Sequence, residues 1–241
     1  MDIVLLNKRL ESLEAEAILK WGLETFRPKV AVSSSFQTQS VPLLHLISRI
    51  CPDMPIIFID TGYHFPETLK FRDNLQNRLG LNIFVYRPST ENRCPLFDDH
   101  SGALYRRDPD LCCYINKVEP MQRVVAELGL EALISGVRRD QTEYRKGLRV
   151  LERQQTGLLR IHPLINWVRS DVFAYIENNG LPKHPLYEWG YTSVGCAPCT
   201  RPVRPGEDER AGRWAGTEKK ECGLHLNLAE MRNPGEKCGK Q

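Results

Sequence analysis

Short apolar segments alternate with segments of helical periodicity through the first half of the chain, and this alternation restricts the fold more than any other feature. The segment from Pro66 to Gly80 is typical of the helices, since it opens with a proline and ends at a glycine. Buried strands are predicted between such helices, at residues 29–33, 55–60, 82–87 and 131–137. Strands that alternate with helices of this length predict an α/β fold with a doubly wound, mostly parallel, Rossmann-like sheet and helices on both faces.

Two further helical patterns lie outside this alternation. Residues 9–23 place Leu10, Leu13 and Trp21 at helical spacing, and residues 170–180 form a second pattern for which Ser170 is the predicted N-cap. From about residue 200 the sequence is rich in proline, glycine and charge. We therefore predict a main α/β domain at residues 1–205 and a mobile C-terminal tail at residues 206–241.

Composition and charge exclude several classes of protein. The 241 residues carry a net charge of +3, too small to imply nucleic-acid binding, and no apolar run is long enough to cross a membrane. The N-terminal segment lacks the pattern of a secretory signal, so we expect a cytoplasmic protein without a nucleic-acid or membrane partner. In that compartment the eight cysteines favour metal binding or redox chemistry over structural disulfides.

Three polar loops follow the predicted strands, at the edge where parallel sheets bind ligands. They are "SSSFQTQ" (residues 33–39), "DTGYHF" (60–65) and "GVRRDQTEYR" (136–145). The first lacks the glycines and lysine of an ATPase P-loop, but its hydroxyl groups can hold an anion at a helix N-terminus as readily as they form an ordinary turn. In the second, Asp60 either caps the next helix or helps to place a nucleotide. The arginines of the third suit phosphate or sulfate oxygens, although a solvated face is the commoner use of such a cluster.

Four of the cysteines form two pairs with metal-ligand spacing. The sequence "DLCCYINK" supplies one pair and the C-x-x-C of "GCAPCT" supplies the other. Adjacent cysteines are unusual in a structural zinc site, whereas they can reach different irons of a cubane, so the spacing favours a 4Fe–4S cluster over zinc. The predicted ligands are Cys112, Cys113, Cys196 and Cys199.

The other cysteines stand alone. Cys222 lies in "TEKKECGLHLN", where Lys219, Lys220 and more weakly His225 are candidates to favour its thiolate and so make it a nucleophile. Cys51 is interpreted as a packing residue and Cys238 as incidental, while Cys94 receives no role.

Taken together, several segments resemble the assimilatory adenylyl-sulfate and phosphoadenylyl-sulfate reductases. They are "SSSF", "DTGYHFPET", "CCYINKVEPM", "GVRRDQ", "HPL" with "GYTSVGCAPCTRPV", and "KECGLH", of which the last two motifs are highly specific. The resemblance covers most of the chain and implies an adenine-nucleotide hydrolase-like fold. In one branch of the family the double cysteine and the C-x-x-C hold a 4Fe–4S cluster, and the other branch lacks these cysteines. This chain resembles the cluster-containing branch.

The resemblance implies an oxidoreductase that reduces adenylyl sulfate (APS) to sulfite and AMP in assimilatory sulfate reduction. Cys222 attacks the sulfur and displaces AMP, and the S-sulfocysteine that forms is cleaved by a thiol of thioredoxin or a glutaredoxin-like reductant. The one cluster per chain is then electrostatic or structural, because thiol chemistry alone supplies the two electrons. A homo-oligomer is also expected.

Roles for individual residues follow from the same resemblance. It places Lys117 between the cluster and the sulfate, Arg145 at the sulfate end, and the tail residues Arg210 and Arg213 over the substrate. The remaining candidate substrate-binding residues are Ser33, Ser34, Ser35, Asp60, Thr61, Gly62, Arg138, Arg139, Gln141 and His225.

The first loop departs from the cluster-containing branch, whose members often carry an acidic residue there. A hydroxyl-rich loop without carboxylates is nearer to the enzymes that use the 3′-phosphorylated substrate (PAPS). PAPS reduction, or use of both nucleotides, is therefore the alternative to APS reduction. The four predicted cluster cysteines indicate APS more strongly than the loop indicates PAPS, so APS is the predicted main substrate.

Two other classes of function compete with a reductase. A ligase or tRNA-sulfur enzyme with an ATP-pyrophosphate loop would need glycines and an aspartate, which "SSSFQTQS" does not supply. A metal scaffold without enzymatic activity would leave the arginine-rich loop and Cys222 without a purpose.

Overall fold

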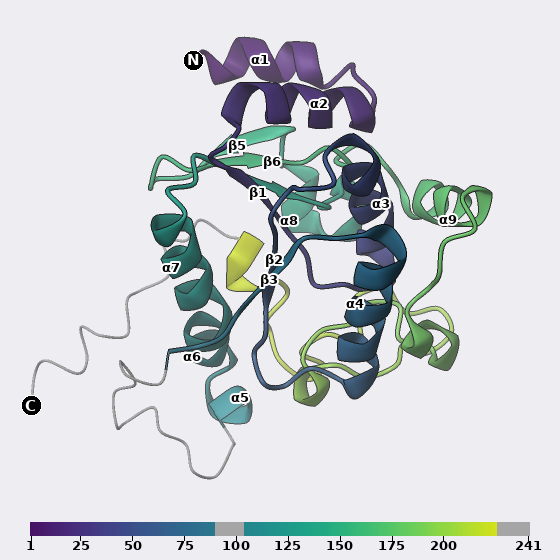
Figure 1. Ribbon diagram of the computed structural model, residues 1–241. Helices are drawn as coiled ribbons and strands as arrows, with labels where there is room; N and C mark the ends of the chain where they lie inside the picture. The colour runs from purple at the N-terminus through teal and green to yellow at the C-terminus, as the bar shows by residue number, and fades with distance from the viewer. Residues whose placement is uncertain (90–103, 226–241) are drawn as a thin grey trace, which may run out of the picture.

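The computed structural model describes residues 1–89 and 104–225, with the side chain of His225 left out. Within these residues a six-stranded sheet has the order β3-β2-β1-β4-β6-β5 (Figure 1). Five strands run parallel, namely β1 (Val30–Ser33), β2 (Ile56–Ile59), β3 (Ile83–Tyr86), β4 (Ala132–Ser135) and β6 (Leu159–Ile161). The edge strand β5 (Leu151–Arg153) is antiparallel to β6. The predicted mostly parallel sheet is confirmed.

Alternate residues of the central strands β1, β2 and β4 supply two separate cores. Val32, Phe58 and Ile134 pack in the larger core against five helices: α1 (Ile3–Leu10), α2 (Ala15–Phe26), α3 (Val41–Ile50), α4 (Pro66–Leu79) and α9 (Arg169–Asn178). Ile57 and Leu133 point to the opposite face, where α7 (Glu119–Glu127) covers them. Helices therefore cover both faces, as the alternation predicts (Figure 1).

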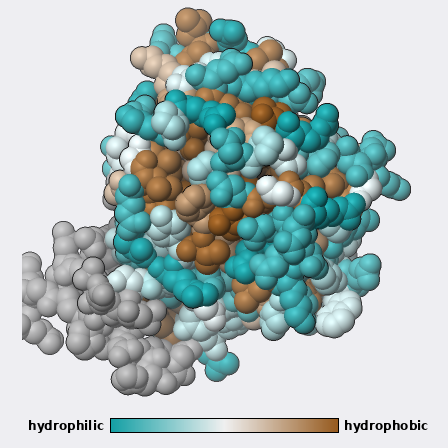
Figure 2. All heavy atoms as spheres, viewed as in Figure 1, coloured by the Kyte–Doolittle hydropathy of each residue, from teal (hydrophilic) through white to brown (hydrophobic). Residues whose placement is uncertain are grey.

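Burial of each such side chain contributes about 1.5–3 kcal/mol, which explains why strands of three or four residues suffice. Figure 2 shows hydrophobic residues gathered in the middle of the view used in Figure 1, with hydrophilic residues around them. No helix in the described ranges is long and apolar enough to span a membrane.

The first predicted helix is divided into two. A turn at residues 11–14 separates α1 from α2, and Leu13 lies in this turn instead of in a helix. The hydroxyl of Ser12 donates to the carbonyl of Arg9 at 2.9 Å, a local bond that competes with the helical ladder. The N-cap prediction for α9 is also wrong, because this helix begins at Arg169 and Val168 is the capping residue.

Strands β5 and β6 were not predicted from the sequence. Their hairpin closes through a bond from the amide of Gln154 to the carbonyl of Leu158. Each strand has three residues, and Arg160 interrupts the apolar pattern of β6, so the usual strand signal is missing. The remaining helices are short, namely α5 (Leu104–Arg107), α6 (Pro109–Cys113) and α8 (Glu143–Lys146).

The segment that follows residue 206, expected to be a mobile tail, is folded onto the main domain as far as Leu224. Trp214 is buried, and its amide donates to the carbonyl of Cys199 at 2.9 Å. Gly212 accepts from the amide of Arg201 at 3.0 Å, and a Cβ at this glycine would lie 2.1 Å from the Arg201 carbonyl oxygen. In this conformation the tail is part of the domain. Cys94, Cys238 and the rest of the tail lie outside the described residues.

Candidate active site

A pocket of about 950 Å³, counting the space at its mouth, lies where the parallel strands end and the tail folds back. The loops after β1, β2 and β4 form one side of it, and the segments around residues 195, 210 and 222 form the other. Many residues predicted from distant parts of the sequence meet here: Ser33, Ser34, Ser35, Thr61, Lys117, Gln141, Arg145, Arg210, Arg213 and Cys222. This is the strand edge at which α/β sheets bind nucleotides.

Asp60 and Gly62 are not among the pocket's lining residues. The carboxylate of Asp60 accepts from the amide of Gly62 at 3.1 Å and from Nε of Arg87 at 3.0 Å. These bonds shape the loop after β2. Two residues of this loop, Thr61 and His64, do line the pocket.

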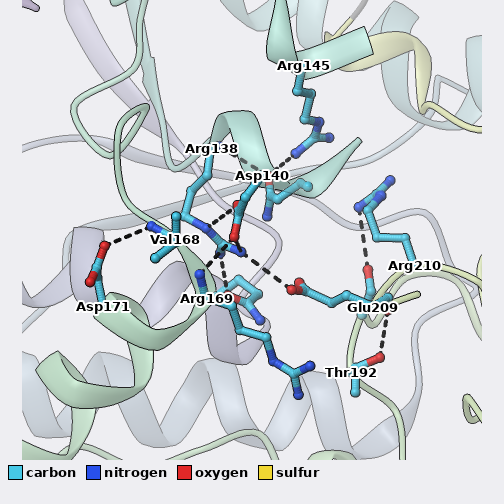
Figure 3. A network of polar contacts seen from close by, with 12 residues as sticks. Arg138, Asp140, Arg145, Val168, Arg169, Asp171, Thr192, Glu209 and Arg210 are labelled. Carbon is cyan, nitrogen blue, oxygen red and sulfur yellow. Dashed lines mark hydrogen bonds and ion pairs between the residues drawn. The ribbon is translucent and has the colours of Figure 1, made fainter. Parts of the chain in front are cut away.

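Arg138 and Arg139 are absent from the pocket lining as well. Arg138 is fully buried; its Nε donates to Asp140 at 2.9 Å and its Nη2 to Glu209 at 3.4 Å (Figure 3). A further bond joins Arg138 to Gln39, and Arg139 pairs with Glu11 at 3.0 Å. Arg138 thereby connects the β4 loop to the tail, because Glu209 belongs to the tail.

Arg210 and Arg213 bring unsatisfied donors to the pocket. The Nε atoms of both are buried and have no hydrogen-bond partner among the described residues. The Arg213 guanidinium lies 4.4 Å from the ring centroid of Trp214 and passes directly over Gly195, where a Cβ would be 2.2 Å from its Nη2. Buried polar groups are usually paired, so these donors indicate a site for an anionic ligand.

Lys117 adds a third positive charge, from the π-helical turn (Tyr114–Val118) between α6 and α7. Such turns often occur at functional sites. Burial opposes its charge, but the sulfurs of Cys196, Cys222 and Cys113 raise the pKa of Lys117. It therefore stays a cation next to the thiols.

Cys222 is 8% exposed and packs with Cys113 and Trp214. A hydrogen bond from the Cys113 thiol lowers the pKa of Cys222 well below its ordinary value, and the charges of Lys117 and Arg213 add to this effect against burial. Lys219 pairs with Asp110 and Lys220 is exposed, so neither of the two lysines expected to act here is a main cause of the lowered pKa of Cys222. The lowered pKa and the neighbouring cations favour the thiolate form of Cys222, which is the form that acts as a nucleophile.

The four cysteines predicted as cluster ligands line one small cavity beside this pocket. Burial raises the pKa of Cys112 to about 11 and also raises that of Cys199. No group of three or more potential ligands in the described ranges has a metal-binding arrangement, and the free thiol of Cys113 donates a hydrogen bond to Cys222. The donor set nevertheless fits an iron–sulfur cluster, since four thiols from two segments meet around one cavity next to a buried lysine.

Several residues of the site were missed in the sequence. The side chain of Gln37 accepts from the amide of Val194 at 3.0 Å and lines the pocket together with Gln39. Glu221 accepts from Nε and Nη2 of Arg145 at 2.9 and 2.8 Å, and this partner lies 76 residues away in the chain. The adjacency of Glu221 to Cys222 is the one signal that could have found it.

Comparisons with known proteins agree with this geometry. A family model described as the phosphoadenosine phosphosulfate reductase domain matches residues 29–202. An adenosine 5′-phosphosulfate reductase from Chelativorans sp. is 43% identical over 224 residues, which cover 92% of this chain and 89% of that protein. A phosphoadenosine 5′-phosphosulfate reductase from Thiocapsa roseopersicina is 42% identical over 223 residues, with 91% of each chain covered.

Solved structures give the same result. The phosphoadenylyl-sulfate reductase from Candida auris, solved as a phosphate complex, matches with a TM-score of 0.73 at 32% identity and covers 83% of this chain and 96% of its own. The FMN adenylyltransferase from Candida glabrata matches with a TM-score of 0.60 at 17% identity, covering 91% of this chain and 79% of its own. At that identity the second match shows a shared fold only.

Proposed function

Because the chain belongs to the phosphoadenosine phosphosulfate reductase family, we propose that it reduces a sulfated adenine nucleotide to sulfite, with Cys222 as the nucleophile. The observation that carries this proposal is the meeting of Cys222 with the free donors of Arg210 and Arg213 in one pocket at the nucleotide-binding edge of the sheet. A buried thiolate surrounded by cations is suited to attack an electrophile that is itself part of an anion.

The nucleotide is held by the loop after β1, and its sulfate faces the cations. Cys222 Sγ attacks the sulfur, the bond from sulfur to the phosphate oxygen breaks, and the nucleotide leaves with that electron pair as its phosphate. Lys117, Arg210 and Arg213 stabilise the negative charge that shifts to the leaving oxygen. The products are S-sulfocysteine at Cys222 and, from APS, AMP. A reductant thiol then attacks Cys222 Sγ, sulfite departs, and a second thiol resolves the mixed disulfide.

A 4Fe–4S cluster would be held by Cys112, Cys113, Cys196 and Cys199. When bound, it supplies a fixed charge and a rigid support beside the sulfate site. Lys117 lines both cavities and so keeps a positive charge between the two sites.

Release of sulfite requires the tail to open. Cys222 is buried in the folded tail, so a protein thiol cannot reach its sulfur in this conformation. We infer that the described part of the tail, residues 206–225, moves away after the first step, and that thioredoxin or a glutaredoxin-like protein then reduces the intermediate. Chemistry of this kind needs reduced thiols, which supports a cytoplasmic location. A homo-oligomer is part of the same proposal.

APS is the proposed main substrate, with measurable use of PAPS. Four cysteines at one cavity favour APS, whereas the loop after β1 lacks carboxylates that would repel a 3′-phosphate. A like-charge contact at an exposed site costs only about 1 kcal/mol, so the loop shifts the preference without forbidding either nucleotide.

A side-by-side assay of kcat/KM for the two nucleotides, with a dithiol as reductant, tests the proposal. We expect sulfite from both nucleotides and the higher kcat/KM with APS. An advantage of tenfold or more for PAPS, about 1.4 kcal/mol of differential transition-state binding, would overturn the APS assignment. Sulfite from neither would overturn the function.

A further inference from the structure

The carboxylate of Glu221, the residue before Cys222, is buried and fully bonded. Its side chain is 5% exposed and that of Arg145 is 4% exposed. One oxygen accepts from Thr142 Oγ1 at 2.7 Å and from Arg145 Nε at 2.9 Å, and the other accepts from Arg145 Nη2 at 2.8 Å. Arg210 Nη2 lies 3.7 Å from that second oxygen. This is the two-pronged pairing by which a guanidinium binds a carboxylate most specifically.

Arg145 differs in this respect from the other arginines that line the pocket. Its remaining terminal nitrogen donates to Gln141, so all three of its nitrogens are engaged by the protein. Arg210 and Arg213 instead keep buried Nε donors without a partner among the residues that the structure describes. Arg145 is therefore fully engaged by the protein, whereas Arg210 and Arg213 each keep one buried donor that an anion can accept.

We propose that Glu221 is a positioning residue, and that its pairing with Arg145 seats Cys222 over the anion site. In this arrangement Arg145 acts on the tail and not on the sulfate, while Lys117, Arg210 and Arg213 receive the sulfate. The inference deepens the proposed function and rests on it for the role of Cys222. It adds that the tail closes through a charge pair located one residue from the attacking sulfur.

The covalent geometry explains why this pair acts on the nucleophile. Consecutive Cα atoms are 3.8 Å apart, so fixing the carboxylate of Glu221 restricts where the backbone of Cys222 can lie. Thr142 lies at the start of α8 and its hydroxyl also accepts from the amide of Arg145 at 3.3 Å. The two residues that bind the Glu221 carboxylate, Thr142 and Arg145, therefore belong to one short turn of the main domain.

The test replaces Glu221→Gln and, separately, Arg145→Met, and follows the alkylation of Cys222 by iodoacetamide in the nucleotide-free protein, with peptide mapping. We expect alkylation to be about tenfold faster or more in both variants, the gain expected when a charged hydrogen bond that holds the tail is lost. The double variant should be no faster than the single ones. In single-turnover reactions S-sulfocysteine should form about tenfold more slowly, with the Kd for AMP within about twofold of the wild type.

Glu218→Gln is the matched control, because Glu218 lies in the same segment but is exposed. It should leave both rates unchanged. Thr142→Val removes one bond to Glu221 and should give a smaller effect in the same direction, which keeps the test informative if a charge variant does not fold.

Three results would overturn the inference. The first is an unchanged alkylation rate in Glu221→Gln, and the second is additive effects in the double variant. The third is a rise in wild-type alkylation to the Glu221→Gln level when AMP and inorganic sulfate, which cannot transfer a sulfo group to Cys222, are added together, which would mean that the sulfate displaces Glu221. The alkylation assay without nucleotide does not depend on sulfate chemistry, so it stands even if neither nucleotide is turned over.

Discussion

Removing the guanidinium of Arg138 tests how the tail is attached to the main domain. Arg138 has 0% of its side chain exposed and pairs with Asp140 and Glu209, whose side chains are 25% and 13% exposed. Arg138→Met keeps much of the buried volume but removes every polar contact of the side chain (Figure 3). The carboxylate of Glu209 then stays buried without its cation.

The magnitude follows from these exposures. Breaking a buried ion pair by removing one partner costs about 3–5 kcal/mol. Asp140 can still reach water, and burial already raises the pKa of Glu209, so that this carboxyl can take up a proton. We therefore expect a loss of about 2–4 kcal/mol in the free energy of unfolding, somewhat less than that range of costs.

Urea unfolding at neutral pH measures this loss. With a slope of about 2–3 kcal/mol per molar, the midpoint should fall by about 1 M. Arg149→Met is the control, because Arg149 is 57% exposed and its pair with Glu11 should contribute no more than about 1 kcal/mol. A loss below about 1 kcal/mol for Arg138→Met, or an equal loss for the control, would refute the reasoning.

Three further predictions concern pH, the thiolate and iron. Burial, with Arg160 and Arg145 nearby, lowers the pKa of His162 to about 3, so the folded protein disfavours a proton that the unfolded chain accepts below pH 6.5. Stability should therefore fall as pH decreases from 6.5 toward 3, by at most about 1.4 kcal/mol per unit from this group, and His162→Asn should flatten the slope of urea midpoints between pH 7.5 and 5. Lys117→Met should raise the pKa of Cys222, measured as a shift to higher pH in the alkylation-rate profile, and an unchanged profile would contradict the charge argument. Protein purified without oxygen should be brown and contain about four irons per chain; Cys51→Ser should keep this iron, and serine should abolish it at Cys112, Cys113, Cys196 or Cys199.

The sheet could be predicted because most of its strands are marked by a run of apolar residues in the local sequence. Apolar segments such as residues 56–59 are fully buried in the structure, and helix boundaries such as the left-handed Gly80 are marked by residue type. The hairpin of β5 and β6 could not be predicted, because its strands are three residues long and one carries the buried Arg160. Tertiary contacts, not local preference, make these residues extended.

The residues of the site could be predicted from the sequence, but the hydrogen bonds and ion pairs between them could not. The loop motifs brought Ser33, Thr61 and Arg145 to one pocket. The sequence could not say which arginine would be free, since that depends on carboxylates distant in the chain. Glu209 lies 71 residues from Arg138, and Glu221 lies 76 residues from Arg145. The same limit applies to the lowered pKa of Cys222, whose main causes are the distant Cys113 thiol and then Lys117.

The central claim is that Cys222 carries the sulfo group between the two half-reactions. The most direct measurement incubates the protein with APS or PAPS in the absence of any reductant and identifies the modified peptide by mass spectrometry. The account predicts one sulfo group per chain on Cys222, release of one nucleotide product per group, and sulfite only after a dithiol is added. Nucleotide release without an adduct, an adduct on another cysteine, or near-normal turnover in Cys222→Ser would contradict it.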